Sequence, residues 1–129
     1  MDKILNLKTH TQNGNIGFGY SIAYYTSKGF TVSIPLNDSQ KYDLIYDDNI
    51  SLKKVQVKTT RQKSKSDNFI VGLRTISGRK VLGFDYESFD FLFVLTDDKE
   101  IYEIPSIILK DYKNSITLND KFQKYKVKL

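Results

Sequence analysis

The residue types that could do chemistry in this sequence gather in one region, where Asp43 is followed by Gln56 and Lys58. A carboxylate and an amide oxygen are ligands that a hard divalent cation accepts. A lysine beside them can steer a water molecule and offset negative charge. Together the three groups suit metal-assisted hydrolysis, provided that the fold brings them to one place.

The first element that must position them is the stretch 52–60, in which Val55 and Val57 alternate with Gln56 and Lys58. A β-strand has a side-chain period of two residues. The pattern therefore predicts a strand whose valines face a core, while Gln56 and Lys58 point together to the other face.

The second element is the stretch 41–46, which carries Asp43 and alternates in the same way. The residues Asp47, Asp48 and Asn49 between the two stretches are typical of a turn. A hairpin through this turn would set Asp43 near Gln56 and Lys58.

The remaining pattern predicts a helix over 16–28 with a cap at 11–14, followed by mostly antiparallel strands. The run 90–95 is the most apolar one and predicts a buried central strand, with Asp90 accepting hydrogen bonds at its start. This order of elements indicates an α+β fold. The other expected elements are strands at 30–35, 69–74, 80–84, 99–104 and 124–129, a turn at 77–79, and short helices or turns at 85–88 and 105–109.

Charge is distributed unevenly along the 129 residues, whose formal net charge is +5. Residues 50–84 hold nine Lys or Arg and one acid, whereas residues 85–104 hold seven acids and one lysine. Such a basic segment fits a polyanion such as DNA, although a solvated basic surface gives the same pattern. The absence of cysteine excludes disulfides and zinc–thiolate sites. No apolar run is long enough to span a membrane, so we expect a cytoplasmic protein.

Asp43 followed by Gln56-Val57-Lys58 resembles the PD-(D/E)xK nuclease pattern, in its variant with glutamine at the acidic position. Further segments, over about residues 10–110, resemble group I intron-encoded homing endonucleases of this fold and small junction-resolvase-like proteins. These segments are Lys28–Pro35, Tyr42–Ile45, Val55–Thr60, Phe89–Phe91 and Tyr102–Pro105.

The resemblance implies one PD-(D/E)xK domain over residues 1–129, with a mixed β-sheet flanked by helices. It implies that Asp43, the side-chain oxygen of Gln56 and the carbonyl of Val57 hold Mg²⁺, or alternatively Mn²⁺. Lys58 would orient or help deprotonate the attacking water. The catalytic residues expected on this basis are Asp43, Gln56 and Lys58.

One position departs from the family pattern. Family members commonly carry a glutamate on the first helix, directly after a Gly-x-x-Gly turn, but here Gly14-Asn-Ile-Gly17 is followed by Phe18. Two hypotheses follow. Another acid, such as Asp38, assists cleavage, or the protein is a non-catalytic relative that binds DNA or a protein.

The resemblance also implies double-stranded DNA as the partner. A long target read by so small a domain implies a homodimer or homotetramer. A structure-selective junction nuclease is the alternative within the family. The basic residues on or near the predicted loop and hairpin, with one hydroxyl, are the expected DNA contacts: Lys53, Thr60, Arg61, Lys63, Lys65, Arg74, Arg79 and Lys80.

Overall fold

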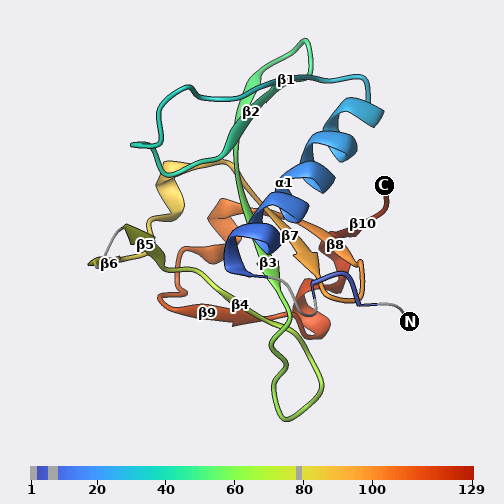
Figure 1. Cartoon of the computed structure of the whole chain (residues 1–129), viewed down its shortest axis with the longest axis vertical. Helices are drawn as coiled ribbons and strands as arrows, with labels where there is room; N and C mark the ends of the chain where they lie inside the picture. The colour runs from blue at the N-terminus through green and yellow to red at the C-terminus, as the bar shows by residue number, and fades with distance from the viewer. Residues whose placement is uncertain (1–2, 6–8, 78–79) are drawn as a thin grey trace.

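The computed structural model describes residues 3–5, 9–77 and 80–129. One α-helix precedes a series of strands and three short 3₁₀-helices (Figure 1), which confirms the α+β prediction. The elements in chain order are α1 (His10–Ser27), β1 (Thr31–Ser33), β2 (Leu44–Asp47), β3 (Leu52–Thr60), β4 (Ile70–Gly72), β5 (Thr75–Ser77), β6 (Lys80–Leu82), η1 (Tyr86–Ser88), β7 (Phe91–Thr96), β8 (Ile101–Pro105), η2 (Ser106–Leu109), β9 (Ser115–Thr117), η3 (Asp120–Tyr125) and β10 (Lys126–Val127).

The main sheet has six strands in the order β1-β2-β3-β7-β8-β10. The central pair β3 and β7 is parallel, and the other neighbours are antiparallel, so the sheet is mixed as predicted. The predicted buried central strand is β7, whose residues 92–96 are all buried. The predicted hydrogen-bond role of Asp90 is also confirmed, because its Oδ2 accepts from the Lys54 backbone N–H at 2.8 Å.

Both faces of this sheet are covered. On one face α1 packs over β3 and β7, and Tyr25, Val55 and Phe93 belong to its core cluster (Figure 1). On the opposite face Leu92 and Val94 pack in a second cluster with the small sheet that β4 and β9 form. The face that Gln56 and Lys58 share is therefore a second core with a polar edge, not open solvent.

Helix α1 starts six residues earlier than predicted. Thr9 caps it, because the Thr9 hydroxyl accepts from the Gln12 N–H at 3.1 Å while the Gln12 side chain accepts from the Thr9 N–H at 2.9 Å. This capping box fixes the first turn, so the stretch 11–14 is helical and not the cap. Among the described residues, neither α1 nor any other helix has the length and apolar character of a membrane span.

Gly17 lies at the point where α1 packs most closely on β3. A Cβ atom at Gly17 would lie 2.4 Å from the Thr59 Cγ2 atom. The helix backbone therefore crosses β3 more closely than any side chain would permit, beside the segment that carries Gln56 and Lys58.

Several predicted strands pair differently. The expected strand 69–74 is shortened to β4 and pairs with β9, some forty residues later, and β5 pairs with β6 instead. The predicted turn at 77–79 lies partly outside the described residues, which omit 78 and 79. The expected strand 124–129 is mostly the 3₁₀-helix η3 with the two-residue β10 after it. The β4–β9 pairing leaves no local signal, since the two strands are some forty residues apart.

Candidate active site

The predicted hairpin forms and brings Asp43 to β3. Strand β2 pairs with β3 from Leu44 opposite Val55 to Asp47 opposite Leu52. Just before β2, the Asp43 N–H donates to the Val55 carbonyl at 2.8 Å. The Asp43 carboxylate then accepts from the Val57 N–H at 2.6 Å. The Asp43 carboxylate therefore bonds the edge of β3 just beyond the first residue of β2.

The carbonyl of Val57 points to this same edge. Alternate residues of a strand direct their backbone groups to opposite sides. Lys54 and Thr60 direct their carbonyls toward the β7 side, where they accept from the N–H groups of Asp90 and Asp97. Val55 directs its carbonyl to Asp43, and Val57, two residues on, shares that direction. One carboxylate and one backbone carbonyl therefore lie along one strand edge.

Gln56 adds a third oxygen with an unusual environment. It pairs in register with Leu92 on the face opposite α1, and it is only 7% exposed. Its Oε1 atom is buried and has no hydrogen-bond partner among the described residues. A buried, unpaired amide oxygen costs free energy. An oxygen of this kind is a ligand type that Mg²⁺ accepts, and a donor set of carboxylate, amide and carbonyl oxygens fits that ion.

Lys58 lies on the same face as Gln56 and is half-buried. Its Nζ donates to the Arg74 carbonyl at 3.2 Å. Burial lowers the pKa of Lys58, and the nearby Asp43 charge acts in the opposite direction. A lysine with a lowered pKa releases a proton more readily than a solvated one. Its position suits a group that orients and deprotonates water.

Asp43 keeps considerable solvent exposure by area, yet the surrounding protein raises the pKa of its carboxyl group above the ordinary value. Loss of hydration is the main cause, and the Val57 N–H and the Lys58 charge partly oppose it. The Asp43 carboxylate therefore has one side open to solvent and one side crowded by protein. The mutual effect on pKa shows that Asp43 and Lys58 lie within each other's field.

Phe18 occupies the neighbourhood of Asp43, as the sequence pattern anticipated. Its side chain lines a hollow of about 230 Å³ that Asp38, Tyr42 and Asp43 also line. Within the described ranges, no group of three or more His, Cys, Asp or Glu side chains is placed to hold a metal ion. Any metal site here therefore relies on the sparse oxygen set described above, with Asp38 as the nearest further carboxylate that the hollow offers.

The expected DNA contacts do not all lie together. Lys53 pairs in register with the buried Tyr46 and so lies on the α1 face. Thr60 is buried, and its hydroxyl donates to the Ile70 carbonyl, which turns it away from solvent. Lys63 is engaged by Asp67 at 3.3 Å and by Asp98 at 3.8 Å.

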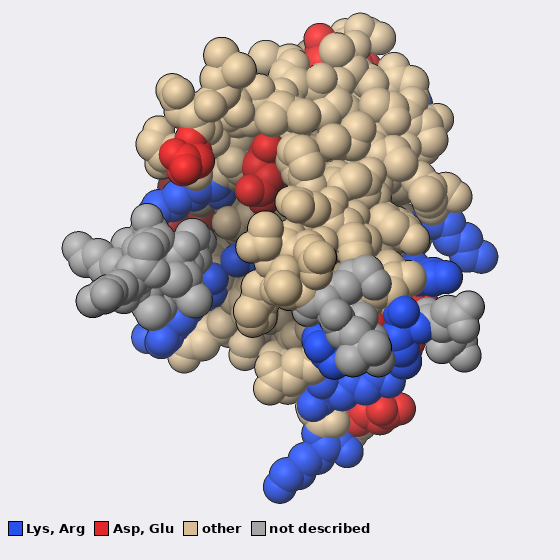
Figure 2. Space-filling view, in the orientation of Figure 1, with Lys and Arg blue, Asp and Glu red and all other residues tan. Residues whose placement is uncertain are grey.

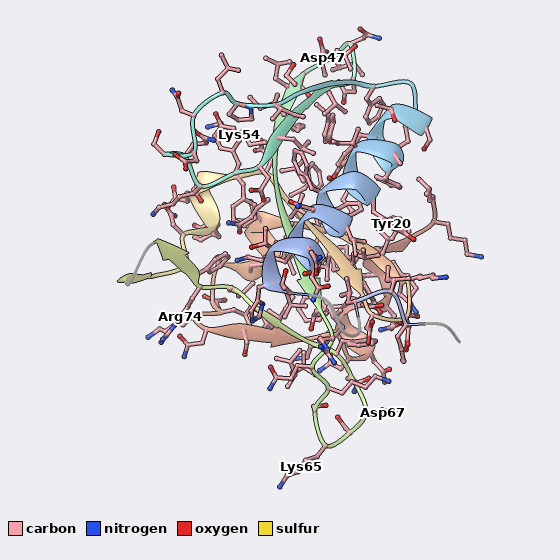
Figure 3. All side chains as sticks on the ribbon, in the orientation of Figure 1. Tyr20, Asp47, Lys54, Lys65, Asp67 and Arg74 are labelled. Carbon is pink, nitrogen blue, oxygen red and sulfur yellow. The ribbon has the colours of Figure 1, made fainter. Side chains whose placement is uncertain are left out.

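The other predicted contacts lie elsewhere. Lys65 lies at the exposed tip of the β3–β4 loop, away from Arg74 (Figure 3). Arg61 lines a separate hollow near the start of α1. The Arg74 carbonyl accepts a hydrogen bond from Lys58 Nζ, so Arg74 lies beside Lys58. Lys80 begins β6, and Arg79 lies outside the described residues.

Figure 2 shows the blue Lys and Arg side chains gathered on the lower half of this face, below α1, which itself carries no Lys, Arg, Asp or Glu. One group that was not expected from the sequence lines the same hollow as Arg74: Lys110, Tyr112, Lys113 and Asn114. The mixture of cations and an aromatic ring was visible in the sequence. The pairing of β4 with β9 that carries this run to Arg74 was not.

A family model described as PD-(D/E)XK endonuclease matches residues 8–127. The chain belongs to the PD-(D/E)XK endonuclease family. The match spans both strands of the candidate site, so Asp43 and Lys58 lie within the part of the chain that defines membership.

A solved structure also resembles this chain. The chain is similar to a bacterial homing endonuclease, I-Ssp6803I, with 27% identity and a TM-score of 0.74. The match covers 91% of this chain and 84% of that protein. No functionally curated protein matches.

Proposed function

We propose that this protein is a metal-dependent DNA endonuclease of the homing-endonuclease type, which hydrolyses phosphodiester bonds in double-stranded DNA. The observation that carries the proposal is the meeting of Asp43, Val57 and Lys58 at the edge of β3. Family membership and the likeness to a homing endonuclease support it. A DNA substrate implies an intracellular site of action.

Asp43, Gln56 Oε1 and the Val57 carbonyl are the groups that would hold Mg²⁺ or Mn²⁺. When bound, the ion would act as a Lewis acid that polarises a phosphoryl oxygen and lowers the pKa of a water molecule. The protein's own contribution is positional. The Val57 N–H fixes the Asp43 carboxylate at 2.6 Å, and the Arg74 carbonyl fixes the Lys58 ammonium at 3.2 Å. Lys58 thus holds its proton-exchanging nitrogen beside Asp43, where it orients water and offsets charge on the phosphate.

DNA recognition would rest on basic residues retained from the sequence prediction: Arg74, whose carbonyl contacts Lys58, together with Lys65, Arg79 and Lys80. A homodimer or homotetramer would join two such sites across a symmetric target. The proposal is tested by DNA cleavage with Mg²⁺ and with EDTA, for the native protein beside Asp43→Ala and Lys58→Ala. Metal-dependent cutting that both substitutions abolish is the expected result.

Phe18 favours a second candidate, a non-catalytic DNA-binding relative. An apolar ring lines the hollow beside Asp43, where a second acidic ligand would strengthen metal binding. This candidate predicts salt-sensitive DNA binding with no cutting in any metal. The cleavage assay separates the two candidates.

A further inference from the structure

A hollow of about 650 Å³ lies beside the core cluster that covers the sheet face opposite α1. Its lining combines aromatic rings with cations: Phe84, Tyr86 and Tyr112, and Arg74, Lys110 and Lys113. We propose that this hollow binds an unstacked nucleotide of the DNA strand, its base against the rings and its phosphate against the cations. The inference rests on the DNA binding proposed above and names the kind of DNA that the protein prefers.

Two of the three rings, Phe84 and Tyr112, pack against the core. Phe84 lies 6.0 Å, between ring centroids, from the buried Phe89, and Tyr112 lies 6.0 Å from the buried Phe122. Phe84 and Tyr112 are themselves only partly buried. Each ring is thus anchored by the core on one side and accessible on another. Anchored aromatic surfaces stack bases at low entropic cost and without sequence preference.

Among the described residues, the cations of the hollow form no ion pair with an acid, unlike other cations of this protein. Among the described residues, no ion pair involves Arg74, Lys110 or Lys113, whereas Lys3, Lys63 and Lys126 are each paired with acids. The acid in the lining, Asp85, uses its carboxylate to cap η1, where it accepts from the Glu87 N–H at 3.0 Å. The hollow therefore keeps an excess of positive charge, which suits a phosphate.

The hollow adjoins the candidate active site through one residue. The Arg74 carbonyl accepts from Lys58 Nζ at 3.2 Å, and the Arg74 Nε donates to Asn114 Oδ1 at 2.8 Å. The backbone carbonyl of Asn114 in turn accepts from the Leu73 N–H at 2.9 Å. A strand held at Lys58 would therefore reach the hollow with a neighbouring nucleotide. The volume of the hollow, about 650 Å³, is in the range of ordinary ligand sites.

The test compares two DNA duplexes of one sequence, one fully paired and one with a single bulged 2-aminopurine. Binding is measured by fluorescence anisotropy in EDTA, so that no cleavage is needed. We expect the bulged duplex to bind about tenfold more tightly, as stacking of one base permits, with 2-aminopurine fluorescence quenched. The variants Tyr112→Ala and Tyr86→Ala should remove the preference and leave affinity for the paired duplex unchanged.

Tyr125→Ala is the matched control. Tyr125 also packs against Phe122, at 6.4 Å between centroids, but it does not line the hollow. It should keep the preference. Tyr86 belongs to neither core cluster, so its substitution tests the hollow even if Tyr112→Ala unfolds. Equal affinity of the native protein for both duplexes, or loss of preference in Tyr125→Ala alone, overturns the inference and leaves the proposed endonuclease intact. Failure to bind either duplex at low salt contradicts both.

Discussion

The carboxylate of Asp43 accepts a hydrogen bond at 2.6 Å from the backbone N–H of Val57, fourteen positions later in the chain. Val57 directs its carbonyl to the same strand edge, between Gln56 and Lys58. The residue that restrains the carboxylate therefore also offers an oxygen beside it. The backbone of β3, more than any side-chain packing, sets the relative positions of the candidate metal ligands.

Replacing Phe18 with glutamate should strengthen metal binding. Phe18 lines the hollow that contains Asp43, so a carboxylate there would join the present sparse oxygen set. We expect Phe18→Glu to tighten Mn²⁺ binding by about tenfold or more, which corresponds to about 1.4 kcal/mol, and to raise the cleavage rate. Isothermal titration with Mn²⁺ measures the first effect, and DNA cleavage measures the second.

Phe18→Gln is the control for this change, since it adds a similar shape without the charge. It should change metal affinity much less than Phe18→Glu. If both variants bind Mn²⁺ as weakly as the native protein does, Phe18 does not face the metal ligands and the account of this hollow is wrong.

The metal-free protein should gain stability when the charge on Asp43 is removed. Loss of hydration raises the pKa of Asp43, so its contribution to stability falls as pH rises through and above its ordinary value of 3.8. Asp43→Asn keeps an oxygen for the Val57 N–H and removes the charge. We expect a higher free energy of unfolding at pH 7 in EDTA, by a few tenths to about 1 kcal/mol, because solvent screens the exposed side.

Urea unfolding at pH 7 and at pH 3 checks this expectation. The difference between Asp43→Asn and the native protein should shrink at pH 3, where the native carboxyl group is protonated in both states. A destabilised variant at pH 7 would show that the charged form is favoured in the metal-free fold.

Two glycines of α1 should respond oppositely to alanine. A Cβ at Gly17 would lie 2.4 Å from Thr59 Cγ2, whereas a Cβ at Gly19 meets nothing within 4 Å. Gly17→Ala should cost about 1–3 kcal/mol by overpacking, despite the better helix propensity of alanine. Gly19→Ala should stabilise by up to about 1 kcal/mol. Thermal unfolding of both variants measures the contrast, and equal effects would mean that α1 does not cross β3 so closely.

Arg74 should contribute to DNA affinity where Lys126 does not. Arg74 lies beside Lys58. Lys126, on the far strand β10, is instead paired through its Nζ with Glu100 at 2.6 Å. We expect Arg74→Gln to weaken binding and to reduce the slope of log affinity against log salt by about 1. Lys126→Gln should leave the slope unchanged. The same slope for Arg74→Gln and the native protein would exclude a phosphate contact at Arg74.

The central strand and the hairpin could be predicted because their signals are local. The alternation of Val55 and Val57 with Gln56 and Lys58, and the turn residues after Asp47, sufficed to place Asp43 on β3. The burial of Gln56 could not be predicted, since it depends on β4 and β9 covering a face that the alternation alone marks as polar.

The start of α1 and the surroundings of Arg74 were missed for different reasons. The capping box of Thr9 and Gln12 is a local pattern, but it precedes the stretch 16–28 on which the helix was predicted. The neighbours of Arg74 come from residues 110–114, which only a pairing across some forty residues brings close. No single-sequence period carries that information.

The most direct measurement is cleavage of a pool of linear, supercoiled and four-way-junction DNA by the native protein, Asp43→Ala and Lys58→Ala, each with Mg²⁺, Mn²⁺ and EDTA. We expect metal-dependent cutting by the native protein, and both substitutions should abolish it while DNA binding persists. Cutting that survives in Asp43→Ala or Lys58→Ala, or that proceeds in EDTA, would contradict a metal-dependent active site at the edge of β3.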